Sequence, residues 1–180
     1  MRDPARADTV ADTDRPSVRD VFRREAAFVM RTIRRLGVWD ADVEDVAQEV
    51  FIVLHRRMPE YDTRTPMRRW LFGIARRVVA DHRCLARVRR ERPSASVLRL
   101  STPPDQHRAL DRAHARMLLD GALDTLSDPQ REVFVLYELE SMPMSEVVAA
   151  VDCPLQTAYS RLHAAREAVR RYVLRREGPR

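Results

Sequence analysis

The chain lacks lysine altogether and is poor in glycine, aromatic residues and cysteine. Only 4 of its 180 residues are Gly and 6% are aromatic, which argues against an all-β fold built on tight turns. The two cysteines, Cys84 and Cys153, form neither a disulfide framework nor a CxxC metal or redox motif. No apolar run approaches the roughly 20 residues of a membrane helix, and the polar start lacks the apolar segment of a signal peptide. We therefore expect a soluble, cytoplasmic protein.

Charge is the most distinctive feature of the composition. Charged residues make up 33% of the chain, the net charge is +6, and all 33 basic residues are arginine. Arginine forms forked hydrogen bonds to phosphates and to guanine edges, so this surplus suits a nucleic-acid partner. Genomic GC bias, which replaces Lys with Arg, and simple solubility explain the same composition. Composition alone leaves these interpretations about evenly balanced.

Three helices are predicted in a first domain at residues 17–92, which follows a polar tail at residues 1–16. Apolar residues recur every three to four positions from Ser17 to Leu36, and Gly37 then supplies a C-terminal stop. A third helix follows Pro66, with an apolar side that contains Trp70 and an opposite side crowded with arginine. The second helix has the clearest spacing, at Val43, Val46, Ala47, Val50, Phe51, Leu54 and Met58.

A second helical domain is predicted at residues 109–176, after a flexible linker rich in Ser and Pro at residues 93–108. The expected fold class is therefore all-α, with two small helical domains. The last two helices are separated by a three-residue break that begins at Asp152, which fits a helix-turn-helix motif as well as it fits an ordinary helical hairpin.

The helix after that break has an apolar side and a polar side. The apolar side is predicted to be buried and consists of Leu155, Ala158, Leu162, Ala165 and Val169. The polar side offers groups that could contact phosphates and base edges, namely Gln156, Thr157, Tyr159, Ser160, Arg161, His163 and Arg166.

Four segments resemble a known family, the extracytoplasmic-function (ECF) sigma factors of bacterial RNA polymerase. The segments DVEDVAQEVF at residues 42–51 and WLFGIA at 70–75 resemble region 2 of that family. The segments LSDPQREVF at 126–134 and CPLQTAYSRLHAARE at 153–167 resemble region 4. The resemblance implies a sigma factor that binds core polymerase and directs promoter recognition and transcription initiation.

The resemblance also implies which residues carry each role. The second helix would dock on the clamp coiled coil of core polymerase through Asp45, Gln48 and Glu49, and the flap of the large subunits would hold the second domain. The third helix and the loop at residues 60–65 would melt and read the −10 element, with Arg64, Arg68, Arg69, Arg76, Arg77 and Arg83 as candidates. The polar side of the last helix would read the −35 element. Trp70 is expected to pack in the core and not to stack on a base.

Two other functions are weighed against sigma activity. One is a stand-alone helix-turn-helix regulator, and the other is a decoy that binds polymerase without opening a promoter. We expect no enzyme activity, because no nucleophile, base and oxyanion donors come together in a pattern. We expect no metal and no cofactor either, since His82 and Cys84 would lie on different sides of a helix and no glycine-rich phosphate loop occurs. The resemblance further implies an anti-sigma factor as a partner.

Asp152 stands where the family's turn often has Gly, and Asp tolerates a left-handed backbone better than most residues.

Overall fold

The computed structural model describes the backbone of residues 15–89 and 106–177 and the side chains of residues 15–85 and 113–176. Every regular element within these ranges is helical, which confirms the all-α fold class. The first half contains α1 (Val18–Arg35), η1 (Asp40–Asp42), α2 (Val43–Arg57), η2 (Met58–Glu60) and α3 (Met67–Arg89). The second half contains α4 (Gln106–Leu123), α5 (Asp128–Phe134), the π-helix η3 (Val135–Leu139), α6 (Met144–Val151) and α7 (Leu155–Glu177).

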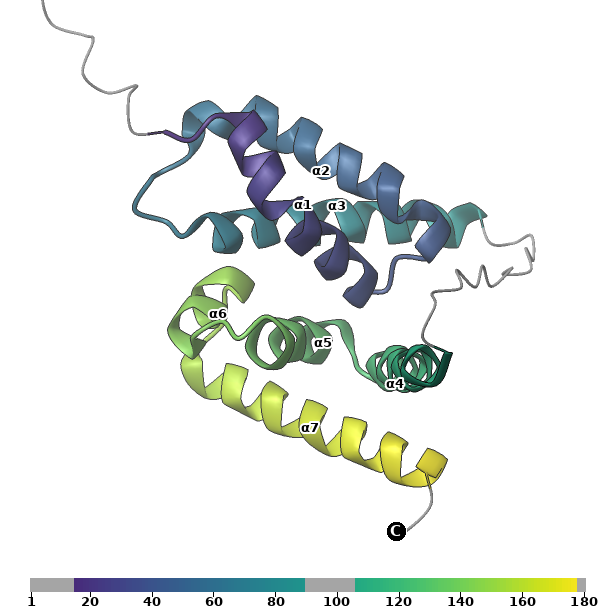
Figure 1. Cartoon of the computed structure of the whole chain (residues 1–180). Coiled ribbons are helices and arrows are strands. Elements are labelled where there is room, and N and C mark those ends of the chain that lie inside the picture. The colour runs from purple at the N-terminus through teal and green to yellow at the C-terminus, as the bar shows by residue number, and fades with distance from the viewer. Residues whose placement is uncertain (1–14, 90–105, 178–180) are drawn as a thin grey trace, which may run out of the picture.

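The two halves lie on opposite sides of the molecule, with α1, α2 and α3 above α4 to α7 in Figure 1. The predicted tail at residues 1–16 and the predicted linker at 93–108 lie largely outside the described ranges, so the domain boundaries stay predictions. No described helix combines the length and the apolar character needed to cross a bilayer.

Helix α1 begins and ends where the sequence predicts. The Ser17 side chain accepts a hydrogen bond from the backbone N–H of Asp20 at 3.1 Å, which satisfies one of the free donors of the first turn. At the other end Gly37 has φ +90°, a left-handed conformation that glycine adopts without steric cost.

The core of the first half forms where α1, α2 and α3 pack on one another. Its most deeply buried large side chains are Phe28, Ile33, Leu54, Leu71 and Phe72. Burial of such a side chain contributes about 1.5–3 kcal/mol, so this cluster stabilises the three-helix arrangement.

In the described parts of α1 and α3, two large apolar residues that follow the helical spacing lie at the surface instead. Leu85 is 61% exposed near the end of α3, and Phe22 is 52% exposed on α1. The Phe22 ring makes an edge contact with Phe51 on α2, with ring centroids 4.8 Å apart. Spacing alone places a residue on one side of a helix but does not say where the neighbouring helix stops covering that side.

The halves are in contact, which the sequence did not predict. Buried side chains from both halves form one continuous hydrophobic cluster, and α3 lies against α6. In addition, Gly37 of the first half lies directly against the guanidinium of Arg131 in α5. That guanidinium is buried and donates hydrogen bonds to the carbonyl oxygen of Leu123 at 2.6 and 3.0 Å. A side chain at position 37 would collide with it.

A substitution at Gly37 tests this junction. We expect Gly37→Ala to lower the free energy of unfolding by about 1–3 kcal/mol, because alanine is strained at φ +90° and its Cβ would strike Arg131. Urea denaturation followed by circular dichroism measures the change.

The matched control is Gly73→Ala in α3, where an added Cβ meets nothing within 4 Å. There the higher helix propensity of alanine should raise stability by about 0.5–1 kcal/mol. Equal effects at the two glycines would contradict the account of Gly37.

Candidate functional site

The six candidate arginines of the first half lie along α3 and the loop before it, and most already have a protein partner. Arg64 pairs with Asp62 at 2.8 Å, and Arg68 pairs with Glu25 at 2.8 Å. Arg69 donates to the Thr65 hydroxyl at 3.4 Å.

The other three arginines lie further along α3. Arg76 pairs with Glu132 at 2.7 Å and Arg83 pairs with Asp128 at 2.6 Å, so both reach α5 of the second half. Arg77 is exposed and has no ion pair with a described side chain. Arg77 is thus the candidate whose guanidinium is most available to a phosphate.

Contacts of Tyr61 and of Arg64 hold the loop before α3. The Tyr61 side chain is buried, its hydroxyl donates to the Thr65 carbonyl oxygen at 2.6 Å, and its ring lies 4.8 Å from that of Trp70. The hydrogen bonds from Arg64 to Asp62 lower the pKa of that carboxyl to about 2. Trp70 is half-buried and packs against the hydrophobic core, which supports the core role expected from its spacing.

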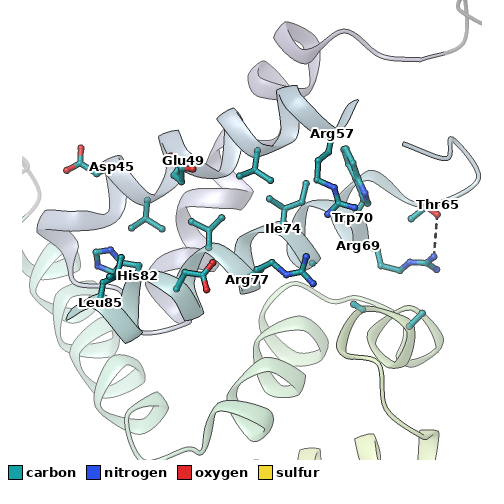
Figure 2. A pocket seen from close by; sticks show the side chains of 17 residues that line it. Asp45, Glu49, Arg57, Thr65, Arg69, Trp70, Ile74, Arg77, His82 and Leu85 are labelled. Atoms are coloured by element: carbon teal, nitrogen blue, oxygen red, sulfur yellow. Dashed lines mark hydrogen bonds between the residues drawn. The ribbon is translucent and has the colours of Figure 1, made fainter. Parts of the chain in front are cut away.

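A groove of about 810 Å³ runs between α2 and α3 and is closed at one side by Ala149 and Ala150 of α6. Figure 2 shows that its charges are separated, with Asp45 and Glu49 toward one end and Arg57 and Arg69 toward the other. Its floor is apolar and includes Trp70 and Ile74. The groove therefore presents an apolar surface with an acidic and a basic end.

The three candidate contacts for polymerase lie on the outer side of α2. Asp45, Gln48 and Glu49 are all exposed, and none forms an ion pair with a described side chain. Their apolar neighbours Val46 and Val50 point inward and are buried. The spacing of α2 thus leaves these polar groups available to a partner.

The helix-turn-helix geometry predicted for the last two helices is present. Helix α6 ends at Val151, Asp152 has φ 51° and ψ 60° in the left-handed region, and α7 begins at Leu155. Asp152 therefore adopts the conformation that the sequence analysis required of it. Ala158, Leu162 and Ala165 are buried as predicted and Val169 is half-buried, but Leu155 is 53% exposed because it lies in the first turn beyond the reach of the core.

The polar side of α7 faces outward. Gln156, Tyr159, Ser160, His163 and Arg166 are exposed, whereas Thr157 and Arg161 are half-buried. The Arg166 guanidinium pairs with Glu138 at 2.6 Å and lies 5.8 Å from the centre of the Tyr137 ring. Five of the seven candidate −35 residues are therefore accessible on α7, and Thr157 and Arg161 are only partly so.

The acidic partners of these arginines were not predicted from the sequence. Asp128, Glu132 and Glu138 each bind an arginine of the candidate DNA-binding surfaces. The Arg76–Glu132 pair spans 56 residues of sequence and the Arg83–Asp128 pair spans 45. No local pattern connects residues so far apart, so no sequence signal marks these pairs. No group of three or more potential metal ligands occurs among the described residues.

Comparisons with known proteins cover both halves. The family Sigma-70 region 2 matches residues 21–92, and the family Sigma-70, region 4 matches residues 116–169. ECF RNA polymerase sigma factor SigL of Mycobacterium tuberculosis is 31% identical over 92% of this chain and 94% of its own length. ECF RNA polymerase sigma factor SigC of the same species is 31% identical over 79% of this chain and 80% of its own length.

The fold is also similar to that of a solved protein. The sigma factor RpoE, in its co-crystal structure with the anti-sigma factor NepR from Bartonella quintana, is 19% identical and has a TM-score of 0.68. The match covers 86% of this chain and 95% of RpoE, so the likeness of fold extends over both halves.

The turn between α6 and α7 gives a second prediction. We expect Asp152→Val to lower the free energy of unfolding by about 1–2 kcal/mol, because a β-branched residue is strongly disfavoured in the left-handed region. Asp152→Gly should leave stability unchanged or raise it slightly, since glycine adopts this conformation freely. Thermal unfolding of the two variants beside the parent chain measures the difference. Equal stability of the Val and Gly variants would contradict the left-handed turn.

Proposed function

The chain belongs to the ECF group of RNA polymerase sigma factors, and from this premise we propose how its two halves divide the work. The first half docks on core polymerase through α2 and reads the −10 element through α3 and the loop before it. The second half reads the −35 element through α7. The observation that carries the proposal is that each role has a helix with the matching chemistry: α2 presents exposed carboxylates, α3 and the loop before it carry a row of arginines, and α7 is the second helix of the helix-turn-helix.

The acidic side of α2 suits a basic partner surface. Asp45 and Glu49 are exposed, carry the same charge and lie one helical turn apart, so together they present a concentrated negative potential. Such complementarity chiefly raises the rate and specificity of association. The proposed partner surface is the clamp coiled coil of core polymerase.

Promoter opening requires cations that hold the displaced strand. The arginines of α3 supply them along one helix, and the tightly held loop at residues 60–65 is the proposed pocket for an unstacked base. In the second half, α7 carries the longer helix of the helix-turn-helix motif, which enters the major groove in such motifs. Gln156, Arg161 and Arg166 have side chains that can read base edges or bind phosphates there.

Two further features follow from this assignment. Membership in a family of initiation factors is consistent with a chain that is not an enzyme. We place the protein in the cytoplasm, where its proposed partners, core polymerase and promoter DNA, occur. We also propose that an anti-sigma factor controls it, and the support is the likeness of fold to RpoE, which was solved with such a factor.

Transcription with purified core polymerase on genomic DNA fragments tests the proposal as a whole. We expect the chain to bind core polymerase and to direct initiation at defined sites, which sequencing of the transcripts would locate. Complete absence of core binding would reject sigma activity. Binding without initiation would identify a decoy, and tight operator binding without polymerase would identify a stand-alone regulator.

Charge reversal on α2 tests the polymerase contact. We expect the double variant Asp45→Arg and Glu49→Arg to bind core polymerase at least about tenfold more weakly, because like charges would then face each other across the interface. Affinity is measured by fluorescence anisotropy of the labelled chain titrated with core enzyme. Asp20→Arg, which changes an accessible carboxylate of α1 outside the proposed surface, is the control and should bind normally. An unchanged affinity of the double variant would move the docking surface elsewhere.

Loss of one arginine tests the −10 surface. We expect Arg77→Ala to weaken binding of holoenzyme to single-stranded non-template DNA and to reduce the slope of log K against log salt by about 0.7, the value for one lost phosphate contact on a single strand. Arg56→Ala, an exposed arginine of α2, is the control. Equal slopes for the two variants would remove Arg77 from the DNA-binding surface.

A further inference from the structure

Two large apolar side chains at the beginning of α7 lie in solvent. Leu155 is 53% exposed and Tyr159 is 49% exposed. They are four residues apart on one helix, so their side chains are neighbours on its surface. Neither belongs to the hydrophobic cluster, and the Tyr159 hydroxyl forms no hydrogen bond with any residue that the structure describes. The fold itself therefore gives no reason for apolar groups at these two positions.

The surface around them is uncharged, which is unusual in this chain. The sequence has 33 arginines among 180 residues, yet residues 155–160 include no charged side chain. The first arginine of α7, Arg161, is half-buried, and Arg166 pairs with Glu138 at 2.6 Å. Guanine is most often read by the fork of an arginine. The beginning of α7 therefore lacks the group that a guanine contact would use.

The exposed groups at the beginning of α7 match a different base pair. In a helix-turn-helix motif, the first residues of the second helix contact base edges in the major groove. An A·T pair presents there the N7 and amino group of adenine beside the C5-methyl group of thymine. The amide of Gln156 can form two hydrogen bonds with adenine, and Leu155 and Tyr159 offer apolar surface beside it. An amide next to apolar groups is thus complementary to A·T.

We propose that Leu155 and Tyr159 are specificity-determining residues, which contact the C5-methyl group of a thymine in the −35 element. This inference rests on the proposed function, because it takes α7 to be the helix that reads that element. The contact removes from water apolar surface that is exposed in the free chain, so it favours binding only where a methyl group is present. Cytosine and guanine offer no such group.

Replacement of thymine by uracil tests the contact at the level of one methyl group. Uracil pairs with adenine as thymine does and lacks only the C5-methyl. The probe is a promoter duplex that the holoenzyme of core polymerase and the full chain selects from genomic fragments, rebuilt with uracil at one thymine of the −35 element at a time, on either strand. We expect the parent holoenzyme to bind at least one of these duplexes about three- to fourfold more weakly, the value of one buried methyl group. Fluorescence anisotropy of the labelled duplex measures the affinity.

Two double variants assign the methyl contact to the apolar pair. Leu155→Asn with Tyr159→Asn removes both apolar groups without changing the charge, and it should bind the thymine and uracil duplexes equally. Its slope of log K against log salt should equal that of the parent, because no phosphate contact is lost. Leu155→Met with Tyr159→Phe keeps apolar surface at both positions and should keep the preference for thymine.

Leu174→Asn is the matched control. Leu174 is 52% exposed on the same helix but lies about 28 Å further along it, which is more than twice the width of the major groove of about 12 Å. This variant should bind like the parent and keep the loss on uracil substitution. Circular dichroism shows whether each variant keeps its helices.

Three results would overturn the inference. They are equal affinity of the parent holoenzyme for thymine and uracil at every position, a −35 element built only of G·C pairs, and a double asparagine variant that still prefers thymine. Failure to bind core polymerase, or binding without promoter selection, would instead reject the proposed function. The titrations would then use duplexes that the free chain selects from a random library, and a free chain that selects none would overturn the inference as well.

Discussion

The relative placement of the two halves depends on how first-half arginines are neutralised by second-half carboxylates. Apolar packing brings α3 and α6 together, but apolar contact is not directional and does not select one orientation. Ion pairs to nearly buried carboxylates are directional, because a displaced partner leaves a charge without water or counter-charge. Glu140, which meets both Arg31 and Arg35, therefore fixes the orientation more firmly than any exposed pair of the chain.

The helices and the turn were predictable from sequence because their causes are local. The spacing of α2, the glycine stop at Gly37 and the left-handed Asp152 each depend on a few neighbouring residues. The contact between the halves was not predictable, because residues such as Arg35 and Glu140 are separated by 105 positions. The same limit applies to the candidate site, where spacing placed Arg76 and Arg83 on α3 but gave no sign of their partners in α5.

The absence of lysine bears on both the contact between the halves and the proposed DNA contacts. A guanidinium presents several donors in one plane and can bind a carboxylate or a phosphate with similar geometry, while its charge persists in a poorly hydrated site. Arg76 and Arg83 can therefore exchange a protein carboxylate for a DNA phosphate without a change of protonation. An ammonium group would favour water over the partly buried position that Arg35 occupies.

The short π-helix η3 lies at two ion pairs with different roles: one holds a candidate DNA-binding arginine of α7, and the other joins the two halves. Glu138, within it, reaches Arg166 on α7, and Glu140, directly after it, reaches Arg35 on α1. One short stretch of chain therefore carries carboxylates that pair with arginines in both halves. A ligand that draws Arg166 away from Glu138 removes one restraint on the segment that carries Glu140.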